Sequence, residues 1–158
     1  SFRAKVTDSL AVAELDAEDY SIVYLAGGWG AAFDLGQSDA LGALVTAANA
    51  EGTAIGGICH GPLGLLRATA TDGSPLVEGR SVSAVTDKQV TELGIESTPL
   101  HPETELRGQG AVFTSRHAFR DVFANHWVVD GNLVTGQNQN AGPMVARELA
   151  RIATTKGN

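Results

Sequence analysis

Cys59 and His60 are the two residues whose types and positions could carry out covalent chemistry, and Cys59 is the only cysteine of the chain. Residues Ala54 to Ile58 before them form a short apolar run that predicts a buried strand. Gly61-Pro62 after them indicates a turn, with proline suited to the first position of a helix. A cysteine at such a corner resembles a nucleophile elbow. Backbone N–H groups and the helix dipole should lower its pKa, although a lone cysteine can also be buried and inert.

A base for Cys59 could come from several places in the chain. Neighbouring residues of a regular strand point to opposite faces, so His60 can pair with Cys59 only if the backbone turns sharply between them. The other histidines, His101, His117 and His126, are alternative bases, and each could equally be a surface or packing residue. Asp87 follows a predicted strand and could orient the His60 ring, or it could cap a helix.

A glycine-rich loop, Gly27-Gly28-Trp29-Gly30, follows the predicted strand over residues 21–26. Ligands of parallel sheets bind at the carboxyl ends of the strands, where both this loop and Cys59 should lie. The backbone N–H groups of Gly28, Trp29 and Gly30 could therefore form an oxyanion hole beside the sulfur. The side chain of Trp29 could line the site around the cysteine, or it could fill the core. Because the chain lacks metal-ligand spacing and phosphate or dinucleotide fingerprints, we expect no metal and no cofactor.

The pattern along the chain predicts an α/β fold with a mostly parallel sheet and one antiparallel hairpin. The runs at 22–25 and 54–58 should be strands covered on both faces, joined by a helix that starts after Ser38 and ends before Gly52. Asp130-Gly131 predicts the hairpin. Further strands are expected at 80–85 and 111–114, and helices after Pro62, at 86–93, after His101 and at 143–154.

Composition indicates one domain over residues 1–158 and excludes several classes of function. The chain is 43% apolar and 18% charged, which is ordinary for a globular protein. A net charge of −7 and a pI near 4.9 argue against nucleic acid or an anionic membrane as partner. There is no apolar run long enough to span a bilayer and no signal-peptide pattern at Ser1. A single cysteine fits a reducing cytoplasm.

Several motifs together resemble the ThiJ/PfpI superfamily, whose fold is similar to class I glutamine amidotransferases. They are Gly-Gly-Trp-Gly-Ala-Ala-Phe-Asp-Leu at 27–35, Ile-Cys-His-Gly-Pro at 58–62, Val-Thr-Asp at 85–87 and the segment at 130–138. The resemblance covers the chain from about Asp16 onward and is greatest to the chaperone-like, glutathione-independent glyoxalases. It implies a flavodoxin-like three-layer α/β sandwich.

The same resemblance assigns roles by position. Cys59 would be the nucleophile, His60 its partner and Asp87 the acidic third member. Backbone N–H groups near Gly28-Trp29 and of His60 would form the oxyanion hole. Trp29 stands where the family often has histidine.

The resemblance also implies that the domain is incomplete at its amino end. Family members have a strand, a helix and a strand before the region that matches Ser1, and this part carries a glutamate that hydrogen-bonds the cysteine. Residues 1–19 contain no such motif. We therefore expect a homo-oligomer, or a second polypeptide that supplies the missing strands.

The function predicted from these residues is a cysteine-dependent conversion of a small reactive carbonyl, such as methylglyoxal, into a hydroxy acid. An amidase or peptidase could use the same cysteine, histidine and aspartate. A third hypothesis is non-catalytic, either a redox sensor that oxidises Cys59 or a holdase chaperone.

Overall fold

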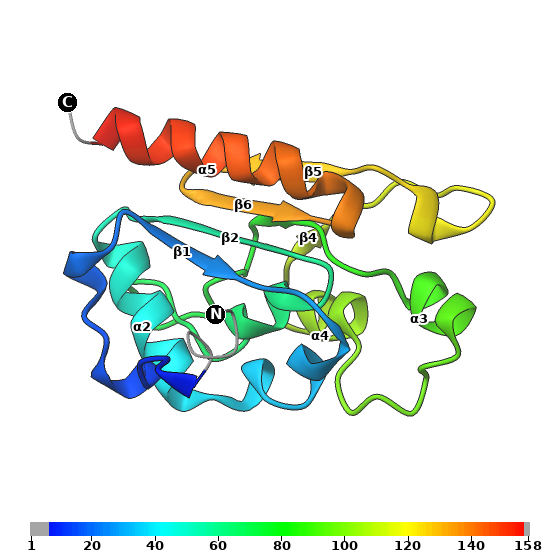
Figure 1. The fold of residues 1–158 in the computed structure, drawn as a ribbon, viewed down its shortest axis with the longest axis horizontal. Coiled ribbons are helices and arrows are strands. Elements are labelled where there is room, and N and C mark those ends of the chain that lie inside the picture. Colours follow the sequence, from blue (N-terminus) through cyan, green and yellow to red (C-terminus); the bar gives the residue numbers. More distant parts are fainter. Residues whose placement is uncertain (1–6, 157–158) are drawn as a thin grey trace.

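The computed structural model describes residues 7–156, in which a four-stranded sheet has the order β1-β2-β6-β5 (Figure 1). The first three of these strands run parallel and β5 is antiparallel to β6. A separate two-stranded parallel sheet pairs β3 with β4. The predicted α/β class, with a parallel sheet and one hairpin, is confirmed. The strands are β1 Ile22–Leu25, β2 Ala54–Ile58, β3 Ser81–Val82, β4 Val112–Phe113, β5 Trp127–Asp130 and β6 Leu133–Gly136.

The unit that leads to Cys59 consists of β1, helix α2 (Asp39–Ala50) and β2. The Ser38 hydroxyl accepts a hydrogen bond from the Leu41 N–H at 3.2 Å and caps the helix at its start. Gly52 follows the helix with φ of +68°, a left-handed conformation that suits glycine. The sequence predicted both ends of this helix correctly, and β1 and β2 pair in parallel as expected for such a crossover.

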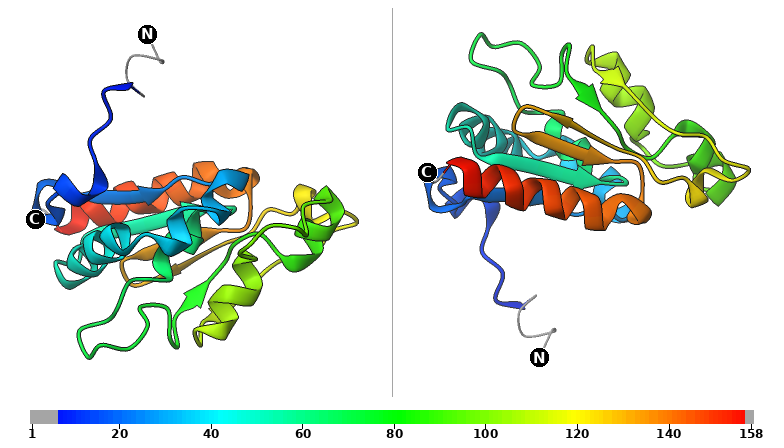
Figure 2. Two further views of the ribbon diagram at one scale, coloured as in Figure 1. Left: turned by 90° about the horizontal axis from the view of Figure 1, so that it is seen from below. Right: turned by 90° about the horizontal axis from the view of Figure 1, so that it is seen from above.

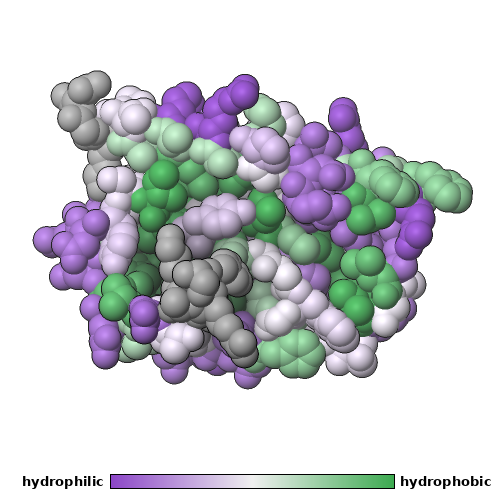
Figure 3. All heavy atoms as spheres, in the orientation of Figure 1, coloured by the Kyte–Doolittle hydropathy of each residue, from purple (hydrophilic) through white to green (hydrophobic). Residues whose placement is uncertain are grey.

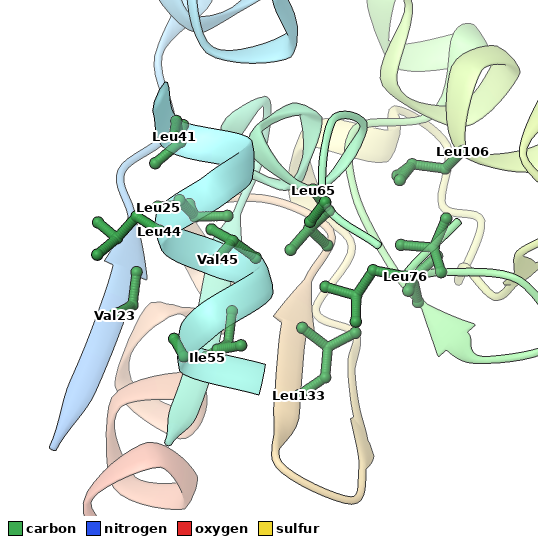
Figure 4. Close-up of a cluster of buried hydrophobic side chains, with 14 of the residues drawn as sticks. Val23, Leu25, Leu41, Leu44, Val45, Ile55, Leu65, Leu76, Leu106 and Leu133 are labelled. Carbon is green, nitrogen blue, oxygen red and sulfur yellow. The ribbon is translucent and has the colours of Figure 1, made fainter. Parts of the chain in front are cut away.

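Two helices cover opposite faces of the sheet, giving the predicted three layers (Figure 2). Helix α5 (Gly142–Lys156) packs against β2 and β6 with a small cluster that includes Val134, Val145 and Leu149. The other face holds the larger core, where side chains of β1, α2, β2 and the segments after them meet (Figure 4). Among residues 7–156, there is no helix with the length and hydropathy needed to cross a membrane.

The middle of the chain has less regular structure than the sequence predicts. The helix expected after Pro62 is a five-residue 3₁₀ helix, Gly61–Leu65, and the strands expected at 80–85 and 111–114 shorten to two residues each. Helices α3 (Asp87–Leu93) and α4 (Pro102–Gly108) lie where they were predicted. In Figure 1, α3 lies on the side toward which β1 and β6 point.

Strand β1 differs from its prediction, because it is covered on one face rather than on two. Val23 and Leu25 are buried against α2, whereas Ile22 and Tyr24 are 37% and 45% exposed on the opposite face. β1 is also an edge strand of the sheet. The apolar run Ile-Val-Tyr-Leu indicated burial, but a run of this kind does not show whether a covering element is present.

A buried carboxylate, Asp121, ties α3 to the loop before β5. Its oxygens accept hydrogen bonds from the Thr86 hydroxyl at 2.8 Å, the Lys88 ammonium at 2.9 Å and the Ala118 N–H at 3.1 Å, and contact His117 Nδ1 at 3.1 Å. Burial alone would raise the pKa of Asp121, but these donors outweigh it and hold the pKa at about 2. The cluster fixes Thr86, which caps the helix that begins at Asp87.

We expect the substitution Asp121→Asn to lower the free energy of unfolding at pH 7 by about 1–2 kcal/mol, a range that allows for solvent screening of the exposed Lys88. A depressed pKa contributes stability above the unfolded-state value of ~3.9 and loses it as the pH falls toward 2. Urea unfolding from pH 7 to pH 2 should therefore show the difference between parent and variant shrinking with acid. Asp8→Asn, on an exposed residue, is the control, and a constant difference across this range would contradict the expectation.

Candidate functional site

Cys59 lies at a sharp backbone corner between β2 and the 3₁₀ helix Gly61–Leu65. Its φ is +60°, and Cys59 is the one non-glycine residue with positive φ in residues 7–156. The backbone is held on both sides, because the Cys59 N–H donates to the Gly136 carbonyl at 3.0 Å and the Cys59 carbonyl accepts from the Val85 N–H at 3.1 Å. Left-handed backbone at a cysteine is strained, and strain of this kind is typical of functional sites.

The corner brings the side chains of Cys59 and His60 together. His60 returns to helical backbone, with φ of −83° and ψ of −13°, and its Nδ1 lies 3.4 Å from Cys59 Sγ. The sharp turn on which this pairing depends is therefore present. The His60 ring is 2% exposed, and its Nε2 is buried without a hydrogen-bond partner among residues 7–156. Burial, followed by the nearby charge of His101, lowers the pKa of His60, so the imidazole is neutral at pH 7.

Two backbone N–H groups, of Gly28 and His60, hydrogen-bond the Cys59 sulfur. Gly28 has φ of +119°, which turns the chain at the end of β1 toward the elbow. Gly27 before it packs so closely that a Cβ there would lie 2.6 Å from the Ile58 carbonyl oxygen and 2.8 Å from Cys59 Cβ. The glycine loop therefore reaches the sulfur through backbone alone.

Trp29 and Gly30, the other two loop residues predicted to line the site, make contacts that anchor the loop. The Trp29 indole N–H donates to the Thr98 hydroxyl, and its ring meets Phe33 edge-on with centroids 6.1 Å apart. The Gly30 carbonyl accepts a hydrogen bond from the Phe33 N–H at 2.9 Å. Trp29 is 48% exposed, so it lies at the surface of the loop rather than in the core.

The expectation that the corner lowers the pKa of Cys59 is wrong. Burial raises the pKa of the thiol, and the N–H groups of Gly28 and His60 oppose this effect only in part. The helix dipole was expected to help, but the helix that follows is five residues of 3₁₀ conformation and so offers only a small dipole. Cys59 and His60 therefore rest as a neutral thiol beside a neutral imidazole.

Asp87 does not hydrogen-bond His60 in this structure. Its Oδ2 accepts a hydrogen bond from the Thr104 hydroxyl at 2.7 Å, and its N–H donates to Glu103 Oε2 at 3.0 Å. Its Oδ1 is buried and has no hydrogen-bond partner in the described part of the chain. The capping alternative is wrong, because Thr86 caps α3 and Asp87 is the first residue inside the helix.

The three other histidines have hydrogen-bond partners of their own. Nε2 of His101 lies 3.1 Å from the Glu96 carbonyl, Nδ1 of His117 contacts Asp121, and Nε2 of His126 lies 3.0 Å from the Thr114 hydroxyl. These contacts favour structural roles for them. His101 also lies close enough to affect the pKa of His60.

Tyr24 is a neighbour of Cys59 that the sequence reasoning did not select. Burial, followed by the negative charge that Cys59 can carry, raises the pKa of Tyr24, so the phenol stays protonated at neutral pH. The apolar run predicts Tyr24 in a buried strand, whereas its side chain is 45% exposed on the edge strand β1, so the sequence contains no signal that points to it. Residues 7–156 contain no group of three or more His, Cys, Asp or Glu side chains that could hold a metal ion.

A family model, the DJ-1/PfpI family, matches residues 3–152 of the chain. The glutathione-independent glyoxalase HSP31 of Saccharomyces cerevisiae is 31% identical over 133 residues, which are 79% of this chain and 54% of the relative. The glutathione-independent glyoxalase hsp3102 of Schizosaccharomyces pombe is 31% identical over 152 residues, 90% of this chain and 60% of the relative. The chain thus spans little more than half the length of these relatives.

Solved structures show the same fold. Glyoxalase III from Candida albicans superimposes with a TM-score of 0.78 at 24% identity, covering 89% of this chain and 60% of that one. Rapid Encystment Protein 24 KDa from Francisella tularensis gives a TM-score of 0.87 at 20% identity, covering 96% of this chain and 66% of that one. The flavodoxin-like architecture expected from the motifs is confirmed.

Alkylation of Cys59 by iodoacetamide should follow a pH profile whose midpoint lies above ~8.5, the value of a free cysteine. The reason is burial of the thiol, which disfavours the thiolate. The rate should be measured by intact mass against a cysteine-containing peptide of free-thiol pKa. A midpoint below that of the peptide would mean that the two N–H groups and His60 outweigh burial.

Proposed function

Because the chain belongs to the DJ-1/PfpI family, we propose that it is a glyoxalase-like enzyme that converts methylglyoxal into lactate without glutathione. Two observations support the proposal. Relatives of about 30% identity carry the name glutathione-independent glyoxalase. The chain also has a strained elbow that holds the Cys59 sulfur 3.4 Å from His60 Nδ1, and this geometry is the observation that carries the proposal.

In the proposed reaction, Cys59 gives its proton to His60 Nδ1 and the sulfur adds to the aldehyde carbon of methylglyoxal. The new S–C bond makes a hemithioacetal, whose oxygen takes up a proton. A proton then leaves the former aldehyde carbon and one returns to the neighbouring carbon through an enediol, which gives a lactoyl thioester. Water cleaves the thioester into lactate and free thiol. The sum is methylglyoxal plus water to lactate, with no external oxidant or reductant.

The resting charge state suits this sequence of steps. The neutral thiol of Cys59 and the neutral imidazole of His60 carry no charge that would attract an anion. In the proposal, the ion pair between thiolate and imidazolium forms only as the sulfur attacks the aldehyde carbon. In our proposal the N–H groups of Gly28 and His60 then stabilise the negative charge that develops on the sulfur or on the substrate oxygen next to it. His60 acts as the general base that moves the proton between the two carbons.

Asp87 has a positioning role in the proposal. Both His60 Nε2 and Asp87 Oδ1 are buried without a protein partner among the described residues. The hydrogen bond from Val85 N–H to the Cys59 carbonyl keeps the segment that leads to Asp87 beside the elbow. A buried water that accepts from one group and donates to the other would satisfy both, as buried waters commonly do. Through it, the Asp87 carboxylate would stabilise the protonated ring of His60.

A redox sensor would use the same cysteine but fits the electrostatics of the site less well. Redox-sensing cysteines are typically accessible and of low pKa, whereas the pKa of Cys59 is raised by burial. A hydrolase would need the same sulfur, base and N–H groups, so activity measurements must separate it from a glyoxalase. A thiol that must stay reduced leads us to place the protein in the cytoplasm.

Incubation of the chain with methylglyoxal should yield lactate, observed by proton NMR, and Cys59→Ala should lower the rate at least ~100-fold, because the substitution removes the nucleophile. Val112→Thr, an exposed residue on β4, is the control and should retain the parent rate. Lactate formation by Cys59→Ala at the parent rate would refute a cysteine mechanism. Hydrolysis of p-nitrophenyl acetate without lactate formation would favour the hydrolase.

The substitution Asp87→Asn should lower turnover about tenfold while leaving thermal unfolding nearly unchanged, because it removes charge but little volume. The pH dependence of kcat should also shift to lower pH, since an imidazolium without a nearby carboxylate has a lower pKa. Thr104→Val is the matched variant, because it removes the hydrogen bond to the other carboxylate oxygen and keeps the charge. An unchanged pH profile in Asp87→Asn would limit Asp87 to a structural role.

A further inference from the structure

The glycine loop, residues 27–30, needs contacts with other segments to keep a defined position beside Cys59. Its residues are glycine except for Trp29, and Gly28 has φ of +119° with open space where a Cβ would lie. Glycine gives a backbone high conformational freedom, so such a loop is not held by its own sequence. Gly27 packs against the corner at Cys59, and the Trp29 side chain ties the loop to a different segment.

That segment is the connection between α3 and α4, residues 94–101, which runs past the end of the loop (Figure 1). The Trp29 indole N–H donates to the hydroxyl of Thr98, which follows it by 69 positions in the chain. Trp29 is 48% exposed whereas Thr98 is 6% exposed, so the acceptor of this hydrogen bond is buried. In Figure 3, the side chains over these two segments, at the lower right, are mostly pale or hydrophobic rather than strongly hydrophilic.

The connection is itself held by local hydrogen bonds. The Ile95 N–H donates to the Val90 carbonyl at 3.2 Å, and the Thr98 N–H donates to the Ile95 carbonyl at 3.1 Å. The His101 ring lies across the same turn, with Nε2 3.1 Å from the Glu96 carbonyl. A connection with these internal bonds can hold a glycine-rich loop in place.

The same connection leads into α4, whose first turn holds Asp87. Glu103 accepts a hydrogen bond from the Asp87 N–H at 3.0 Å, and the Thr104 hydroxyl donates to Asp87 Oδ2 at 2.7 Å. The segment from Thr98 to Thr104 therefore contacts two parts of the candidate site, the glycine loop and Asp87.

We propose that Thr98 is a positioning residue for the candidate site, and that through the Trp29 indole it holds the Gly28 N–H against the Cys59 sulfur. Without the hydroxyl, the indole N–H would lose this acceptor, and the half-exposed Trp29 could turn toward water at small cost. The loop would then be free on its outer side, and the Gly28 N–H would spend less time on the sulfur. This role concerns the hydrogen-bond donors of Cys59, so it stands whether or not the chain converts methylglyoxal.

Two substitutions separate the Thr98 hydroxyl from the packing around it. Thr98→Val keeps the branched shape of this buried side chain and removes the hydroxyl, whereas Thr98→Ser keeps the hydroxyl. In hydrogen exchange followed by NMR, the Gly28 amide should exchange about three- to tenfold faster in Thr98→Val than in the parent, because it loses a hydrogen bond of ordinary strength. Thr98→Ser should exchange as the parent does. Trp29→Phe, which removes the N–H from the exposed partner, should repeat the result of Thr98→Val.

A second comparison tests whether the effect is directed at the sulfur. Cys59→Ala removes the acceptor of the Gly28 N–H, so adding Thr98→Val to it should change the Gly28 exchange rate less than about twofold. Thr104→Val is the matched control on the same segment, because it breaks the contact with Asp87 and not the contact with the loop. In this control, Gly28 should exchange at the parent rate.

Two results would overturn the proposal. One is a Gly28 amide that exchanges at the same rate in Thr98→Val and in the parent. The other is an equal acceleration by Thr98→Val with and without the sulfur, which would limit Thr98 to general support of the fold.

Turnover of methylglyoxal distinguishes this proposal from the proposed function. Thr98→Val should lower kcat by a similar factor and leave KM unchanged, since in the proposed reaction the Gly28 N–H stabilises charge only as the sulfur attacks. A parent that forms no lactate would refute the proposed function, and the exchange rates would still decide the role of Thr98.

Discussion

The candidate site depends on the close approach of two backbones, at the end of β1 and at the corner after β2. Gly27 and Gly61 make it possible, because a Cβ at either position would overlap the backbone of the facing strand. This approach lets the Gly28 N–H reach the Cys59 sulfur. It also forces Cys59 into left-handed backbone, which turns the His60 ring back toward the same sulfur. The pair and its hydrogen-bond donors thus follow from one packing constraint.

That constraint also explains the electrostatics of the site. Packing that brings the donors to the sulfur removes water from it, and the loss of water outweighs the donors in setting the thiol pKa. The same burial keeps His60 neutral and leaves its Nε2 without a protein partner. A neutral pair costs little to bury, and in the proposed reaction the charges appear only when the sulfur attacks the substrate.

The sequence was sufficient where local chemistry decides the structure. Ser38 and Gly52 marked the ends of α2, Asp130-Gly131 marked the hairpin, and Gly61-Pro62 marked the corner at Cys59. Burial was predicted poorly, because it depends on elements distant in sequence. The run Ile22–Leu25 has the same sequence pattern whether one face or both faces are covered. The expected lowering of the pKa of Cys59 depends on a helix after the corner, and this helix is one short 3₁₀ segment.

The hydrogen bond from Cys59 to the Gly136 carbonyl has a consequence for how the protein is made. β2 pairs with β6, its neighbour in the sheet but not along the chain, so the elbow is completed by a strand that the ribosome adds much later. Contacts between distant segments form slowly, and a nascent chain folds as its segments emerge. Until β6 has been synthesised, Cys59 is therefore an ordinary thiol, and its special surroundings arise only after Gly136 has joined the sheet.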